Sequence, residues 1–245
     1  MNWTGTIDWS EKIFSYCERG ENSGFWAEPF NAISNGAFMV ASLLALVAWA
    51  GMPAQRRGLA ELGLIAIVAI IGLGSFLFHT IATRWTAIAD IAPIGAFMLL
   101  YAVYAMRRFL RLNWLLVAAG VALFGWLMQL AYTAPCPTAF RGLVAGRHCL
   151  NGTMVYLPGF FMLTGVGLFS ALKGHSSAKY LLTGSVILAA SIVARSLDQE
   201  LCPVSALWGQ RRGTHAAWHL LNATMLALML LAAVRHGNVG SGRTQ

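Results

Sequence analysis

Long apolar stretches alternate with short polar segments along most of the chain. A helix needs about 20 apolar residues to cross the hydrocarbon core of a bilayer. Windows of this length occur seven times, at residues 31–52, 59–80, 86–106, 113–132, 153–172, 180–196 and 215–234. Residues that favour turns stand between them, as in Gly51-Met52-Pro53. The pattern predicts an all-α polytopic membrane protein that folds as a seven-transmembrane helix bundle.

The composition agrees with this prediction. Of the 245 residues, 58% are hydrophobic and only 11% are charged, whereas a soluble domain is about 25% charged. No internal repeat and no second soluble domain is visible, so residues 1–245 are expected to form one domain. Residues 1–30 are polar and lack the apolar core of a cleaved signal peptide. We expect them to form an exoplasmic segment, and residues 237–245 to form a flexible tail.

The distribution of positive charge predicts the orientation in the membrane. The formal net charge is +8, but the basic residues lie in pairs near the ends of the spans rather than along a soluble face. This favours a topology signal and contacts with anionic lipids over nucleic-acid binding. The short loops on the side of the C-terminus are densest in Arg and Lys, so this side is expected to be cytoplasmic. The prediction is an integral protein of a bacterial inner membrane with a periplasmic N-terminus.

All four cysteines fall on the side of the N-terminus, and none lies within a span. They are Cys17, Cys136, Cys149 and Cys202. An even number of cysteines on one side indicates an oxidising compartment. Four cysteines allow three pairings. We favour Cys136 with Cys149 inside one loop and Cys17 with Cys202 between distant segments, with four reduced thiols as the alternative.

Five polar residues from three spans share one depth in the predicted bundle. Ser75 and His79 end the second span, Asp90 lies near the start of the third, and His215 and His219 begin the seventh. Two histidines four residues apart lie on one face of a helix. Three imidazoles with a fourth position open are the ligand set of a catalytic zinc site. The alternative is that these side chains form separate hydrogen bonds between helices.

Acidic and amide side chains gather in the N-terminal segment, among them Glu18, Glu21, Asn22 and Glu28. Their oxygens could hold calcium, which takes 6–8 oxygen ligands. A solvated acidic stretch is the alternative interpretation of the same residues.

Three sequence blocks resemble the alkaline ceramidase family, in a form typical of bacterial members. This family belongs to a superfamily of seven-span membrane hydrolases that includes the adiponectin receptors. GFWAEPFNAISN at 24–35 is similar to the family's AE-x-x-N-x-x-SN segment. GSFLFHTIATRWTAIADIAP at 74–93 is similar to its S-x3-H followed eleven residues later by Asp, and THAAWHLLNA at 214–223 to its H-x2-WH block. The blocks extend over nearly the whole chain in the family's order and spacing.

The resemblance implies roles for individual residues of the buried cluster. It implies zinc ligands at His79, His215 and His219, with Ser75 and Asp90 as catalytic neighbours. It implies a zinc-dependent intramembrane amide hydrolase that cleaves ceramide or a related N-acyl sphingolipid into a long-chain base and a fatty acid. The partner would be a membrane lipid, and the sequence indicates no nucleic acid and no particular protein.

The resemblance also implies a calcium site beside the zinc site, built from a DWCE-x-N motif and from Glu28. SYCER at 15–19 aligns best with that motif, which makes Glu18 a ligand and Asn22 a candidate, although Ser15 stands where the family has an aspartate. DWSE at 8–11 fits the letters but lies too far upstream. Cys17 falls on a disulfide cysteine of the family, which supports its pairing with Cys202.

The expected mechanism uses Asp90 as general base and then general acid, and Ser75 as a hydrogen-bond donor to the oxyanion. Five apolar residues could line an acyl-chain pocket or belong to the ordinary core: Phe97, Met98, Phe160, Phe161 and Met162. Two alternative functions share the same cluster. One is a related lipid ester or amide hydrolase, and the other is a receptor or sensor without enzymatic activity that holds structural zinc.

Overall fold

The computed structural model describes residues 7–136, 149–207 and 209–237. These residues include seven helices that are long enough and apolar enough to cross a membrane. The elements are α1 (Pro29–Ser34) and α2 (Gly36–Ala50), which form one span, then η1 (Ala54–Arg56), α3 (Leu59–Ile81), α4 (Arg84–Arg108), α5 (Trp114–Thr133), η3 (Cys149–Tyr156) with α6 (Leu157–Leu172), α7 (Ala178–Ser196) and α8 (His215–His236). The predicted seven-span, all-α fold is confirmed, and span ends differ from the expected ones by at most four residues. Residues 1–6 and 238–245 of the predicted terminal segments lie outside the described residues.

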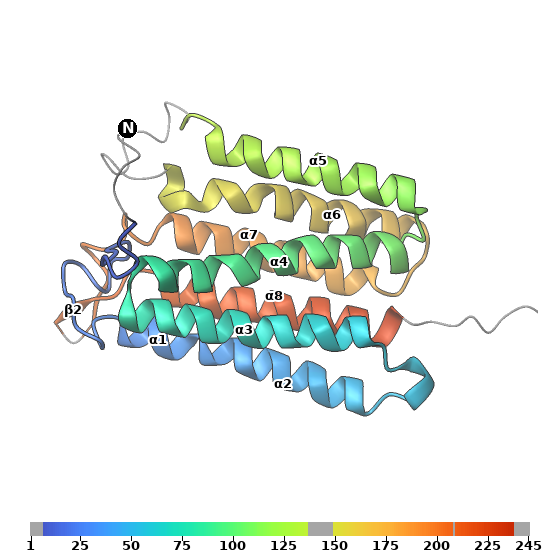
Figure 1. The fold of residues 1–245 in the computed structure, drawn as a ribbon, viewed down its shortest axis with the longest axis horizontal. Helices are drawn as coiled ribbons and strands as arrows, with labels where there is room; N and C mark the ends of the chain where they lie inside the picture. The colour runs from blue at the N-terminus through green and yellow to red at the C-terminus, as the bar shows by residue number, and fades with distance from the viewer. Residues whose placement is uncertain (1–6, 137–148, 208, 238–245) are drawn as a thin grey trace, which may run out of the picture.

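The helices form a closed ring. Each packs against the next along the chain from α2 to α8, and α8 returns to pack against α2 (Figure 1). Helix α5 lies at the edge and buries only Val117 and Phe124. Helix α8 is the most enclosed and places Leu230 in a core shared with Val68 of α3 and Leu181 of α7. The six spans other than α5 therefore surround the centre of the ring.

A two-residue turn joins α3 to α4 and fixes the relative depth of their polar residues. Helix α3 ends at Ile81, and Ala82 adopts a left-handed conformation with a φ of 52°. Thr83 then caps α4 in a reciprocal capping box with Thr86, a pattern that satisfies free N–H groups of the first turn. Consequently, side chains near this junction lie at the same end of the bundle, whether they come from the last turns of α3 or from the first turns of α4.

Close packing at Gly74 sets the distance between α3 and α4. A Cβ atom on Gly74 would lie 2.0 Å from the carbonyl oxygen of Ala89 and 3.2 Å from the amide nitrogen of Asp90. Only a residue without a side chain permits this approach. It brings Ser75 and Asp90, each next to one of the contacting residues, to the same part of the helix interface.

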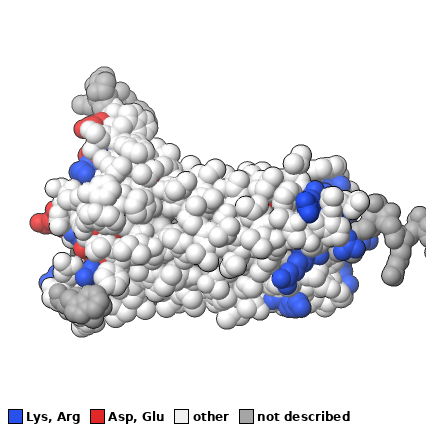
Figure 2. All heavy atoms as spheres, turned by 90° about the horizontal axis from the view of Figure 1, so that it is seen from below, with Lys and Arg blue, Asp and Glu red and all other residues white. Residues whose placement is uncertain are grey.

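The two ends of the bundle differ in charge. The N-terminal segment and the short hairpin of β1 (Ala206–Leu207) and β2 (Gln210–Arg211) gather at one end, whereas α8 finishes at the other (Figure 1). Lys and Arg dominate the visible charges at the end where α8 finishes, while both signs appear at the N-terminal end (Figure 2). This is the charge asymmetry on which the predicted orientation depends.

Candidate active site

Three histidines meet at the N-terminal end of the ring. His79 comes from the last turn of α3, and His215 and His219 come from the first turns of α8. All three are buried, and one ring nitrogen from each lies within 4.8 Å of the other two. The i, i+4 spacing on α8 accounts for two of the three positions, and the antiparallel packing of the ring supplies the third.

Hydrogen bonds orient two of the three imidazoles. His79 Nδ1 lies 2.6 Å from Oε2 of Glu28, and His219 Nδ1 lies 2.7 Å from Oγ of Ser34. His215 stacks on the ring of Tyr16, with centroids 3.8 Å apart. Contacts of this kind to the second nitrogen fix the tautomer and the direction of a metal-binding histidine.

The free ring nitrogens fit a metal ion. His79 Nε2 and His215 Nδ1 are buried and have no hydrogen-bond partner among the described residues. A buried polar atom without a partner is costly, and a shared cation would satisfy both nitrogens. Three imidazoles suit zinc, which they bind in catalytic sites with one further position open. The cluster is therefore compatible with zinc.

Ser75 and Asp90 share a cavity with two of the histidines. Both side chains are buried, and both line a cavity that His215 and His219 also line. The close approach of the helices at Gly74 explains why they lie together. The structure thus brings the five predicted site residues into one region.

The rest of the cavity wall is largely apolar. The cavity encloses about 820 Å³ of empty space, part of it open to the outside, between α2, α3, α4, α6, α7 and α8. Phe97, Met98 and Met162, for which the sequence left pocket lining and ordinary core open, line it, and Phe97 also belongs to the core cluster. Phe160 packs against the core cluster instead, and Phe161 is 64% exposed. A mostly apolar wall with a few polar side chains suits a long alkyl chain beside a polar head.

A cation also faces this cavity. Arg195, near the end of α7, donates a hydrogen bond of 3.1 Å to the hydroxyl of Tyr16. Its guanidinium lies 5.3–5.6 Å from the ring centroids of Tyr16, Tyr156 and Trp218. Aromatic faces attract a cation at this distance, so these rings hold Arg195 in place, and no carboxylate of the described residues forms an ion pair with it.

Comparison of the sequence with protein-family models identifies the family of this chain. The family model described as Ceramidase matches residues 2–244. The chain belongs to the ceramidase family. The resemblance drawn from the three sequence blocks is confirmed, and membership implies a hydrolase that acts on amide bonds and a substrate among membrane lipids. A search of curated proteins finds no match.

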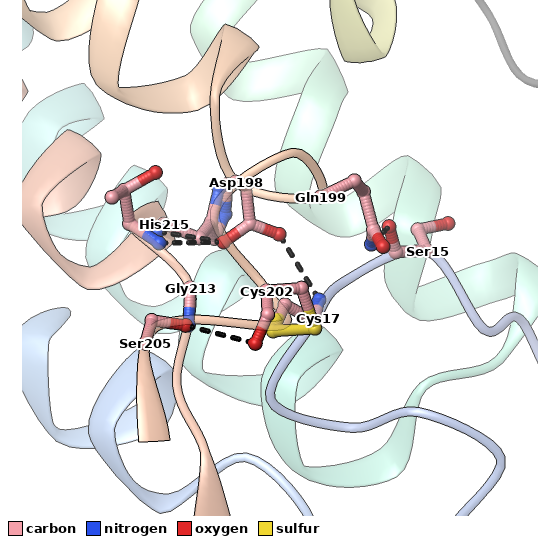
Figure 3. The surroundings of a disulfide bond; sticks show 9 residues. Ser15, Cys17, Asp198, Gln199, Cys202, Ser205, Gly213 and His215 are labelled. Carbon is pink, nitrogen blue, oxygen red and sulfur yellow. Dashed lines mark hydrogen bonds between the residues drawn. A yellow bond between two sulfur atoms is a disulfide. The ribbon is translucent and has the colours of Figure 1, made fainter. Parts of the chain in front are cut away.

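Both disulfides favoured for this ceramidase-family chain are present, Cys17–Cys202 and Cys136–Cys149. Figure 3 shows how the first one meets the start of α8. Asp198 accepts hydrogen bonds from the backbone N–H groups of Cys17 at 3.0 Å, Thr214 at 2.9 Å and His215 at 2.9 Å. Burial raises the pKa of Asp198, and these three donors offset only part of that rise. One carboxylate thus joins the disulfide segment to the helix that carries two histidines.

The residues named for calcium contact arginines. Glu28 forms an ion pair with Arg19, and Glu18 forms one with Arg212 at 2.7 Å. Burial acts to raise the pKa of Glu28, but the contacts with His79, Asn31 and Arg19 outweigh it and lower that pKa below its ordinary value.

The other oxygens of the predicted calcium set are engaged as well. Glu18 also accepts the N–H groups of Phe30 at 3.0 Å and Asn31 at 2.8 Å, and Asn22 Oδ1 accepts the N–H of Gly24 at 2.8 Å. Calcium needs 6–8 oxygens directed at one point. Glu18, Asn22 and Glu28 therefore do not fit a calcium ion in this ceramidase-family chain.

Sequence reasoning did not identify Ser34 and Arg19, which contact the histidines or their partners. Ser34 lies inside the block at 24–35, so its place in that block was a signal for it. Arg19 follows the Cys17-Glu18 pair directly, but nothing in the local pattern indicates that its side chain reaches the end of α3.

Proposed function

We propose that this chain is a zinc-dependent hydrolase that cleaves the amide of ceramide or of a related N-acyl sphingolipid within the membrane. One observation carries the proposal. Three buried imidazoles converge, and two of them, His215 and His219, line a cavity that also presents Ser75 and Asp90 and is otherwise mostly apolar. A lipid amide has this same arrangement of one polar group beside long alkyl chains.

The chemistry follows from the roles these side chains can take. His79, His215 and His219 would hold the zinc ion, which would supply Lewis acidity at the amide carbonyl and lower the pKa of a water molecule. Asp90 accepts the proton of the attacking water and returns it to the nitrogen of the leaving long-chain base. The hydroxyl of Ser75 donates a hydrogen bond to the developing oxyanion.

The position of the site suits a substrate that enters from the membrane. The histidines and the disulfide Cys17–Cys202 lie at the same end of the bundle. Disulfides persist in oxidising compartments, which supports an exoplasmic location for this end. The amide of a sphingolipid lies just below the headgroup plane, so lateral entry from the exoplasmic leaflet brings it to the depth of the histidines.

The test combines metal analysis with a lipid panel. The protein, purified in detergent, is expected to hold about one zinc per chain and to release fatty acid from N-acyl sphingolipids in mass spectrometry. His79→Ala and His219→Ala should lose the zinc, and a wild-type protein without zinc would contradict the proposal. Cleavage of O-acyl lipids alone would establish the alternative ester hydrolase, whereas zinc with no turnover on any lipid would favour the receptor.

Asp90→Asn isolates the role of the carboxylate. It should retain zinc and lose turnover by about 10²- to 10⁴-fold, the usual contribution of general acid–base catalysis. Turnover close to that of the wild type would remove Asp90 from the mechanism.

A further inference from the structure

A single buried arginine lies where the family resemblance places a calcium ion. The side chain of Arg19 is fully buried and forms an ion pair with Oε1 of Glu28. Its other nitrogens donate to four backbone carbonyls, those of Asn22 at 3.1 Å, Gly24 at 3.2 Å, His79 at 2.8 Å and Thr80 at 3.4 Å. A guanidinium has five N–H donors, and five oxygens surround this one.

The contacts of Arg19 lead directly to one of the three histidines. Glu28 uses one oxygen for Arg19 and the other for Nδ1 of His79. Arg19 also holds the backbone carbonyl of the same histidine. His79 is thus held at its ring by Glu28, which is paired with Arg19, and at its backbone carbonyl by Arg19 itself.

We propose that the guanidinium of Arg19 is a built-in substitute for calcium in this chain. It gathers one carboxylate and four carbonyl oxygens, as a calcium ion does, and it positions His79 through Glu28. Arg19 is a positioning residue, because it contacts neither the cavity-lining Ser75 nor Asp90. The inference rests on the metal site of the proposed function but not on the identity of the lipid.

The first test uses the wild-type protein, so it does not depend on any variant folding. Protein dialysed into calcium-free buffer with zinc replenished should contain no stoichiometric calcium by elemental analysis. Adding calcium up to millimolar concentration should leave its unfolding temperature unchanged. A bound calcium, or an unfolding temperature that rises as calcium saturates a site, would overturn the proposal.

The second test measures zinc affinity in competition with a chromophoric chelator. Loss of a group that orients a metal ligand lowers affinity by about 10- to 100-fold, and we expect such a loss in Arg19→Gln. The matched control is Arg84→Gln, which removes the exposed ion pair of Arg84 with Glu11 beside the same α3–α4 turn. Its zinc affinity should stay within about twofold of the wild type, since exposed ion pairs contribute little.

The outcomes separate this inference from the proposed function. Wild-type zinc affinity in a folded Arg19→Gln would overturn the positioning role. A wild-type protein that binds neither zinc nor calcium would contradict the proposed hydrolase, while the absence of a calcium site would stand.

Discussion

The three histidines differ in what restrains their rings. Glu28 contacts His79, Ser34 contacts His219, and the ring of Tyr16 covers His215. A carboxylate, a hydroxyl and an aromatic face restrain a ring to different degrees. The contribution of each contact to metal binding can therefore be measured separately.

The hydroxyl of Ser34 gives a prediction at this scale. Ser34→Ala removes the hydrogen bond to His219 and should lower zinc affinity by about tenfold, the smaller end of the range for such contacts. Zinc competition measures the change. Ser42→Ala is the control, because Ser42 lies on the adjoining helix α2 and its hydroxyl donates to the backbone carbonyl of Ile65 rather than to a histidine. An equal loss of affinity in both variants would show that the effect is structural.

The histidines could be predicted from sequence, whereas Arg19 could not, for a physical reason. The depth of His79, His215 and His219 follows from counting spans, since helices cross the bilayer with alternating direction. The contacts of Arg19 depend on how an irregular segment folds over the end of α3. No periodic pattern in the sequence indicates how that segment folds. The sequence therefore suggested a calcium ion as the partner of Glu18 and Glu28, rather than the arginine side chains that they contact.

Among the helices, α3 and α4 make the closest approach that bears on the candidate site. Its geometry follows from the two-residue turn after Ile81 and from the absence of a side chain at Gly74. The predicted spans at 59–80 and 86–106 leave a short connection between these helices, but they do not indicate the tight contact with Ala89. Helix packing distances depend on side chains that face each other, and a single sequence does not pair them.

Gly74→Ala tests this contact. The added methyl group meets the carbonyl of Ala89, so the helices must move apart at a cost of about 1–3 kcal/mol for overpacking. We expect a lower unfolding temperature and reduced turnover, because Ser75 and Asp90 separate. Gly63→Ala is the matched control on the same helix, since a Cβ there has nothing within 4 Å. A neutral result at Gly74 would mean that the contact does not set the helix spacing.

Over the whole molecule, the two disulfides act at very different ranges. Cys17 and Cys202 are 185 residues apart in sequence, whereas Cys136 and Cys149 are 13 apart. In the chain-entropy model a disulfide contributes about 3 kcal/mol for a 15-residue loop and about 4.7 kcal/mol for a 100-residue loop. The long-range bond also ties down the segment of Cys17, two residues before Arg19.

Removing each disulfide should therefore have unequal effects. The double variant Cys17→Ser with Cys202→Ser should lower the unfolding temperature and the zinc affinity. The double variant Cys136→Ser with Cys149→Ser should lower the unfolding temperature less and leave zinc affinity near that of the wild type. Equal losses of zinc affinity would argue against a specific link between the first disulfide and the histidines.

The orientation of the bundle is a separate prediction. The positive end should face the cytoplasm, so green fluorescent protein fused to the C-terminus should fluoresce in bacterial cells, and an alkaline phosphatase fusion there should be inactive. An active phosphatase fusion would reverse the orientation and place the disulfide end in a reducing compartment.

The bond between Cys17 and Cys202 also orders events during biosynthesis. The first cysteine leaves the ribosome long before the second, and His79 is likewise made well before the two histidines of α8. Until the last span is inserted, only His79 of the three clustered histidines is in place, because His215 and His219 both lie on α8. If the proposed function holds, the nascent protein would thus cross the membrane six times before it could act on the lipids around it.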